Sequence, residues 1–232
     1  MSTDLNLAPH AQTSTDPRPA PRSGWLAISG LLLLSALPII GGALSLREAS
    51  VPSGDAFAWA STVAMVAHIV SMSVYCVVGA FQFSPALRAR RGWHRRAGRV
   101  LLPLGFLAAV SGAWLAVFFG GPADELPLAM VRLFFSAVMM AFLAMSAIAI
   151  VRRDFAAHGA WSTRAFAIAV SGGTQALVSV LWSLPFGEPD TAGETWVVAA
   201  GFTINWLVAE LIVRHRANGR SRKATERGAL VS

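Results

Sequence analysis

The 232 residues are 55% hydrophobic and only 13% charged, and the chain carries a net charge of +7 at pH 7. This balance differs from that of a soluble globular domain and is typical of a polytopic membrane protein. The positive charge does not predict nucleic-acid binding, because the arginines are spread over four separate segments. Such an arrangement suits contact with anionic lipid headgroups instead.

Six apolar segments are each long enough to cross a hydrocarbon core of about 30 Å, which takes about 20 helical residues. They lie at residues 25–46, 57–83, 98–119, 127–151, 163–185 and 196–213. Lipid offers no hydrogen-bond partner to exposed backbone groups, and these runs lack the alternation of barrel strands. The sequence therefore predicts an all-α, polytopic integral membrane bundle of six transmembrane helices, forming one domain at residues 24–216.

The basic residues predict how this bundle is oriented. All of them except Arg47 and Arg132 lie in the two tails or around the second and fourth connections between spans. By the positive-inside rule, we expect both termini to face the cytoplasm, as in a multi-pass protein of a cytoplasmic (inner) membrane. The polar tails at residues 1–23 and 217–232 lack apolar periodicity, and we expect both to be disordered in the cytoplasm.

Polar and small residues inside the spans indicate which helix faces turn toward protein. In the second span, at about 100° per residue, a polar seam covers about a third of the circumference. Its members are Ser61, His68, Ser71, Tyr75, Gly79 and Gln82. Smaller sets are Arg164, Ser171, Gln175 and Trp182 beside Gly172 and Gly173 in the fifth span, and Gly98, Gly105 and Gly112 in the third. These stripes predict close helix packing.

His68 is the first candidate site residue, because an imidazole near the middle of a bilayer needs a partner, a cavity or an iron atom. The alternative is a neutral histidine that is hydrogen-bonded to a neighbouring helix. About 15 residues, or about 22 Å of helix, separate His68 from the inner end of its span. His68 and His94 therefore cannot be axial ligands of one haem if that helix is continuous.

His94 and His158 are the other candidates, since each precedes a span at the predicted cytoplasmic mouth. There they could converge on a haem, a metal or an anionic headgroup. Asp154 comes four residues before His158. If the helix begins early, the two share a face and with His94 form a two-histidine, one-carboxylate metal set. The alternative is that these histidines are solvated or contact lipid.

One string of residues resembles a bacterial family of multispan proteins catalogued as domain of unknown function 2306. The string is His68, Gly79, Gln82-Phe83, Leu87-Arg88, His94-Arg95 and Gly98-Arg99, followed by Arg153-Asp154, His158, Trp161 and Arg164. The resemblance covers about residues 60–185 and implies that His68, His94, His158 and Arg164 are the positions to test. The family often has a basic residue about twelve positions after the last arginine, where this chain has Gln175 and Ala176.

A looser similarity runs to the cytochrome b561 class, in which histidines of a four-helix core hold haem b. The shared feature is the His-x-x-x-Gly spacing from His94 to Gly98. The chain departs from that class because it lacks the full set of paired intramembrane histidines. The resemblance implies one haem at most.

These observations leave three functional hypotheses. The first is a haem b or other redox-ligand site for transmembrane electron transfer, served by a redox partner. The second is a non-enzymatic component, monomeric or homo-oligomeric, that binds lipid or a small solute or supports a larger complex. The third is a metal-dependent hydrolase built on His94, Asp154 and His158. In the first two, the expected pocket or headgroup contacts are Tyr75, Gln82, Arg99, Arg164 and Gln175.

Overall fold

The computed structural model describes residues 23–48, 56–119 and 125–229, and within these ranges the chain is helical apart from short turns. The helices are α1 (Ser23–Glu48), α2 (Ala56–Gln82), α3 (Pro85–Ala89), α4 (Arg91–Phe118), α5 (Leu126–Val151), α6 (Phe155–Ala169), α7 (Ser171–Phe186) and α8 (Thr191–Ala229). The predicted all-α fold is confirmed.

Five of these helices, namely α1, α2, α4, α5 and α8, are long and apolar enough to cross a membrane. The bent pair of α6 and α7 makes a sixth crossing when it is counted as one span. Large apolar side chains such as Leu33, Val70 and Phe134 are exposed on the outer faces. Outward apolar faces with backbone bonds satisfied inside each helix are what a bilayer requires. The chain is therefore a multi-pass membrane protein with five or six spans.

The predicted fifth span at 163–185 is not one helix. It is replaced by α6 and α7, which meet at Val170 with a bend of 42°. Gly172 and Gly173 follow the bend, and glycine is a poor helix former. The Ser171 hydroxyl also donates to the Ile168 carbonyl oxygen (2.7 Å), a local bond that competes with the regular helix ladder. The apolar run alone did not reveal this interruption.

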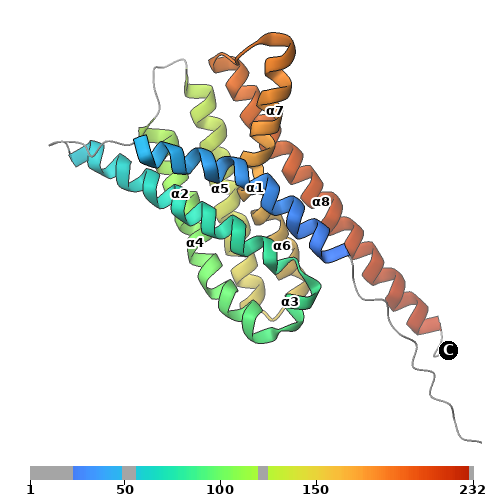
Figure 1. The fold of residues 1–232 in the computed structure, drawn as a ribbon. Coiled ribbons are helices and arrows are strands. Elements are labelled where there is room, and N and C mark those ends of the chain that lie inside the picture. The colour runs from blue at the N-terminus through green and yellow to red at the C-terminus, as the bar shows by residue number, and fades with distance from the viewer. Residues whose placement is uncertain (1–22, 49–55, 120–124, 230–232) are drawn as a thin grey trace, which may run out of the picture.

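The predicted disordered tail after residue 216 is also wrong for most of its length, because α8 continues to Ala229. Arginine and alanine are good helix formers, and an Arg222–Glu226 ion pair (3.3 Å) links successive turns. Figure 1 shows this end of α8 extending away from the other helices. The predicted tail at 1–23 lies outside the described residues except for Ser23, which begins α1.

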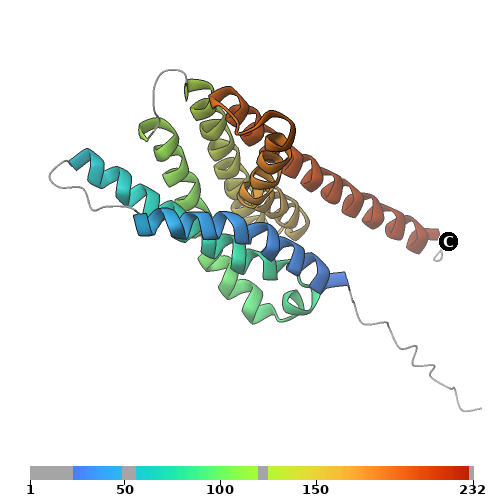
Figure 2. The same ribbon diagram turned by 45° about the horizontal axis from the view of Figure 1, so that its top comes forward.

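The helices pack in an order that places α6 inside and α1 at the edge. α2 packs against α4, α4 against α5, and α5 against α6 and α8, while α7 packs against α8. α1 lies on the outside along α2 and α7, as both ribbon views show (Figures 1 and 2). The core between α2, α4, α5 and α6 includes Tyr75, Phe135, Met139, Leu143 and Phe166.

The glycine stripe predicted for the third span is confirmed at two of its three positions on α4. A Cβ atom at Gly105 would lie 2.8 Å from the Tyr75 ring, and one at Gly112 would lie 3.0 Å from Cε1 of His68. Gly98 has no neighbouring atom within 4 Å of such a Cβ. The two inner glycines therefore let α2 place an aromatic ring and an imidazole directly against α4.

Candidate functional site

His68 lies in the middle of α2 and turns toward α4. Its ring Nδ1 donates to the Ala108 carbonyl oxygen over 2.8 Å, and the Ser111 hydroxyl oxygen lies 3.5 Å from the same nitrogen. A carbonyl oxygen can only accept, so Nδ1 must carry the proton. The absence of a side chain at Gly112 leaves room for the ring. The predicted inward orientation of His68 is confirmed, and its Nε2 holds the lone pair of the neutral ring.

A cavity of about 200 Å³ lies beside His68 at the level of the bend between α6 and α7. Its wall contains residues from α1, α2, α4, α5, α6, α7 and α8. The polar members are Ser35, His68, Ser73, Ser136, Ser171 and Gln175. The remaining wall is apolar or glycine, and no Asp, Glu, Lys or Arg side chain of the described residues belongs to it. The cavity can therefore offer hydrogen bonds but no countercharge.

The bend next to the cavity is held by side chains that bond to its backbone. Asn205 of α8 donates through Nδ2 to the Ala167 carbonyl oxygen of α6 (3.1 Å). Its Oδ1 accepts a hydrogen bond from Thr174 of α7 (2.8 Å), so one amide connects both sides of the bend. The Cys76 thiol donates to the Ala169 carbonyl oxygen (3.6 Å). Carbonyls freed by a helix break within the membrane need such partners.

Asn205 was not among the predicted site residues, although the sequence contains a signal for it. It is a buried amide within the last apolar segment, and polar groups within spans are expensive unless they have partners. Gln175, which was predicted, does line the cavity and donates to the Ser171 hydroxyl (3.2 Å). Tyr75 belongs to the core instead. Both amide atoms of Gln82 are buried without a hydrogen-bond partner among the described residues.

The metal set predicted from His94, Asp154 and His158 is not assembled. In the described ranges, no three His, Cys, Asp or Glu side chains lie close enough to hold a metal. Asp154 caps the N-terminus of α6 by accepting from the Ala157 backbone N–H (2.9 Å). His158 contacts the Ser146 hydroxyl through Nδ1 (2.9 Å), and Ser146 in turn bonds Ser162 (2.8 Å). These groups serve helix capping and packing.

The three candidate histidines occupy separate places. His68 lines the cavity, while His94 lies in the first turn of α4 and His158 in the first turn of α6, outside the cavity wall. Arg99 is exposed on α4. The cavity, at about 200 Å³, is smaller than the roughly 300–1,000 Å³ typical of sites for drug-sized ligands. Of the three histidines, only His68 is therefore placed to contact a ligand in this cavity.

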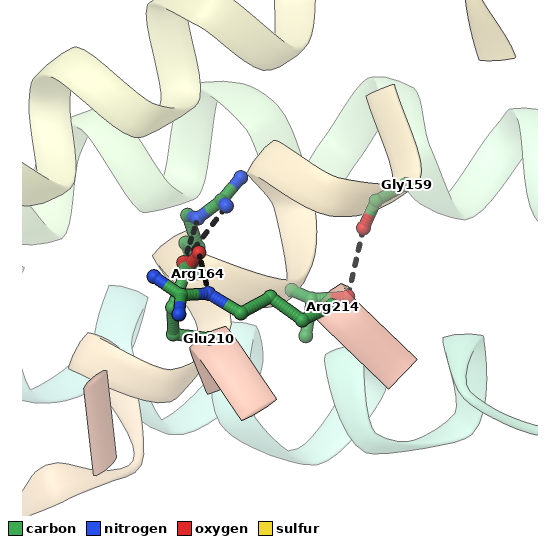
Figure 3. A network of polar contacts seen from close by, with 5 residues as sticks. Gly159, Arg164, Glu210 and Arg214 are labelled. Carbon is green, nitrogen blue, oxygen red and sulfur yellow. Dashed lines mark hydrogen bonds and ion pairs between the residues drawn. The ribbon is translucent and has the colours of Figure 1, made fainter. Parts of the chain in front are cut away.

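Arg164 forms the second polar cluster of the bundle, one to two turns of α6 away from the bend. Its guanidinium contacts Glu210 of α8, with Nε and Nη2 both 2.8 Å from Oε2. Arg214 reaches the other oxygen of that carboxylate (3.2 Å). Figure 3 shows the two guanidinium groups meeting at Glu210. The Arg164 guanidinium also lies 4.7 Å from the centre of the Trp161 ring, a cation–π geometry.

Glu210 explains why Arg164 is tolerated within the apolar region. Glu210 also pairs with Arg214 four residues later on α8, a spacing at which helical side chains meet, while its bond to Arg164 reaches α6. Arg164 was predicted as a pocket or headgroup contact, and in the structure its partners are Glu210 and Trp161. The cluster thus ties α6 to α8.

The comparison with protein families matches residues 65–213 to a family model described as a predicted membrane protein, DUF2306. The chain belongs to this family. The match confirms the resemblance stated from the sequence and extends it into α8, as far as residue 213. No curated protein and no solved structure matches the chain. The DUF2306 region contains His68, the bend at Val170 and the Arg164–Glu210 pair, whereas all of α1 precedes it.

Proposed function

We propose that this DUF2306 protein binds a small uncharged molecule in the cavity at the centre of its membrane bundle. The observation that carries the proposal is a space of about 200 Å³ walled by apolar groups, hydroxyls, one amide and one imidazole. An apolar cavity of about 150 Å³ is large enough to accept benzene. A charged ligand would lose its hydration there without gaining a countercharge, which is costly.

His68 supplies the recognition chemistry in this proposal. Its Nδ1 proton is committed to Ala108, so Nε2 accepts hydrogen bonds. The preferred ligand then carries one hydrogen-bond donor on an otherwise apolar body. This is the solute-binding alternative among the three hypotheses drawn from the sequence.

Haem b, with electron transfer, stays a prediction from the sequence. An oxidised-minus-reduced spectrum of protein purified after haem-replete expression tests it. Because the cavity is small and only His68 of the three histidines lines it, we expect no Soret or α band. A stoichiometric haem spectrum would replace the small-molecule proposal with the redox one.

We also propose the bacterial inner membrane as the location, with both ends of the chain in the cytoplasm. The distribution of arginines supports this orientation. Anionic headgroups at the cytoplasmic face, a redox partner and a homo-oligomer stay predictions from the sequence.

Cys76 allows the ligand proposal to be tested without altering the chain. It is the sole cysteine, lines the cavity and is 3% exposed. We expect phenol in the cavity to slow the alkylation of Cys76 by N-ethylmaleimide. Anisole lacks the hydrogen-bond donor, so about fivefold more of it should be needed for the same protection. This factor corresponds to one hydrogen bond of about 1 kcal/mol. The rates are measured by intact mass on protein in nanodiscs.

Substitutions distinguish recognition of the ligand by His68 from simple filling of the cavity. We expect His68→Phe to remove the difference between phenol and anisole, and His215→Phe, at an exposed position of α8, to preserve it. Equal protection by the two compounds in the unaltered protein would contradict recognition by His68. Absence of protection by either compound would contradict the cavity as a ligand site.

A further inference from the structure

We infer that the cavity takes its ligand directly from the bilayer, through the seam between α1 and α7, and that α7 opens this seam by turning at Val170. The seam is defined by Leu34 and Pro38 on α1 and by Gly172 and Gly173 on α7. This inference rests on the proposed function. It adds the route of entry and the class of ligand, a molecule that partitions into lipid.

α1 forms part of the cavity wall at the edge of the bundle. Only 11% of the residues in the most apolar stretch of α1 are buried, compared with 28% in that of α2 and 33% in that of α4. It lies at the edge of the bundle in both ribbon views (Figures 1 and 2). Three of its residues, Ser35, Pro38 and Ile39, nevertheless line the cavity. Moving α1 and α7 apart would therefore expose the cavity to the hydrocarbon core.

The contact across the seam consists of close packing alone. A Cβ atom at Gly173 would run into the Leu34 backbone carbonyl, and one at Gly172 would lie 3.2 Å from Cβ of Pro38. No side-chain hydrogen bond or ion pair joins α1 to α7 in the described part of the chain. Interfaces between small residues hold helices by van der Waals contact. By contrast, α6 is joined to α8 by Arg164–Glu210.

The bend at Val170 allows α7 to move while α6 stays fixed. The backbone ladder is already interrupted there, and Asn205 holds the Ala167 carbonyl independently of α7. Rotation at Val170 would break the Thr174–Asn205 and Ser171–Ile168 hydrogen bonds and would disturb the packing of α7. Hinges are usually a few residues at element ends that absorb the change in backbone angles. Ser171, Gly172 and Gln175 would then move away from the cavity.

A disulfide across the seam tests this route. The double variant Pro38→Cys/Gly172→Cys places Cβ atoms near 3.2 Å, close to the roughly 3.5–4.5 Å of disulfides. The matched control Gly42→Cys/Ile69→Cys starts from a Cβ separation of 3.7 Å and fixes α1 to α2 instead. Peptide mapping identifies each bridge and reports alkylation of Cys76 separately from the introduced thiols.

We expect the oxidised 38–172 bridge to slow alkylation of Cys76 by N-ethylmaleimide by at least about tenfold, since the opening is blocked. Reduction of the 38–172 bridge should raise the rate again. Since Ile69 also lines the cavity, the control is compared with its own reduced form, and closing the 42–69 bridge should leave that rate unchanged. An equal change of rate on oxidation in the two variants would contradict entry through the seam. If phenol still protects Cys76 while the 38–172 bridge changes nothing, the entry route fails and the proposed function stands.

A second measurement uses the unaltered chain and does not depend on the folding of a variant. In liposomes, N-ethylmaleimide, which is neutral and enters lipid, should alkylate Cys76. A permanently charged trimethylammonium thiosulfonate of similar size should not react, because it cannot approach through hydrocarbon. Comparable reaction with the charged reagent would show an aqueous route and overturn lateral entry.

Discussion

Gly173→Ala is expected to lower the free energy of unfolding by about 3 kcal/mol, at the upper end of the usual range for overpacking. The added methyl group would run into the backbone carbonyl of Leu34. A backbone atom cannot rotate away as a side chain can, so α1 must shift from α7. The measurement is the thermal unfolding midpoint of the purified protein in one fixed detergent.

Gly159→Ala is the matched control for this substitution. Gly159 lies in α6 with no atom within 4 Å of the added Cβ. Alanine is better than glycine in a helix by up to about 1 kcal/mol, so this variant should be as stable as the parent or more so. A Gly173→Ala protein with an unchanged midpoint would show that α1 does not pack on α7 as described.

Arg164→Met is expected to destabilise the protein by about 2 kcal/mol, less than the loss of a fully buried ion-pair partner. The side chains of Arg164 and Glu210 are 15% and 26% exposed, so solvent screens the pair in part. The substitution removes two short contacts to Glu210 and the contact with Trp161. Unfolding midpoints in detergent again provide the measurement.

Arg214→Met separates this pair from its neighbour. Arg214 is 73% exposed, and its loss should change stability by less than about 1 kcal/mol. A double-mutant cycle between Arg164→Met and Glu210→Gln should give a coupling energy of about 1–2 kcal/mol. A coupling near zero would mean that the Arg164–Glu210 contact contributes nothing to stability.

The spans were predictable because their signal is local. A run of about 20 apolar residues is sufficient evidence for a membrane helix. The interruption at Val170 was not predictable, because the apolar run continues through it. The bend depends on tertiary contacts. The bend is stabilised by Asn205 and Cys76, which come from other helices. The helical end of α8 was missed for another reason, since its polar composition resembles that of a disordered tail.

The site was predictable in part. The polar seam of α2 correctly indicated that His68 turns inward, because a polar group within a span is costly unless it meets protein. The partner of that imidazole, the carbonyl oxygen of Ala108, could not be predicted, since every residue carries a carbonyl. The Arg164–Glu210 bond spans 46 positions of sequence. Only the packing of α6 on α8 brings those charges together.

The bend between α6 and α7 also determines whether the chain crosses the membrane an even or an odd number of times. The two helices contain 15 and 16 residues, so each is about 23 Å long and too short to cross a hydrocarbon core of about 30 Å alone. If the pair turned back within the membrane, α8 would run the opposite way. Its arginines would then lie across the bilayer from those that precede α4. A single crossing keeps all of these guanidinium groups in one compartment, so this one kink decides where the C-terminus emerges.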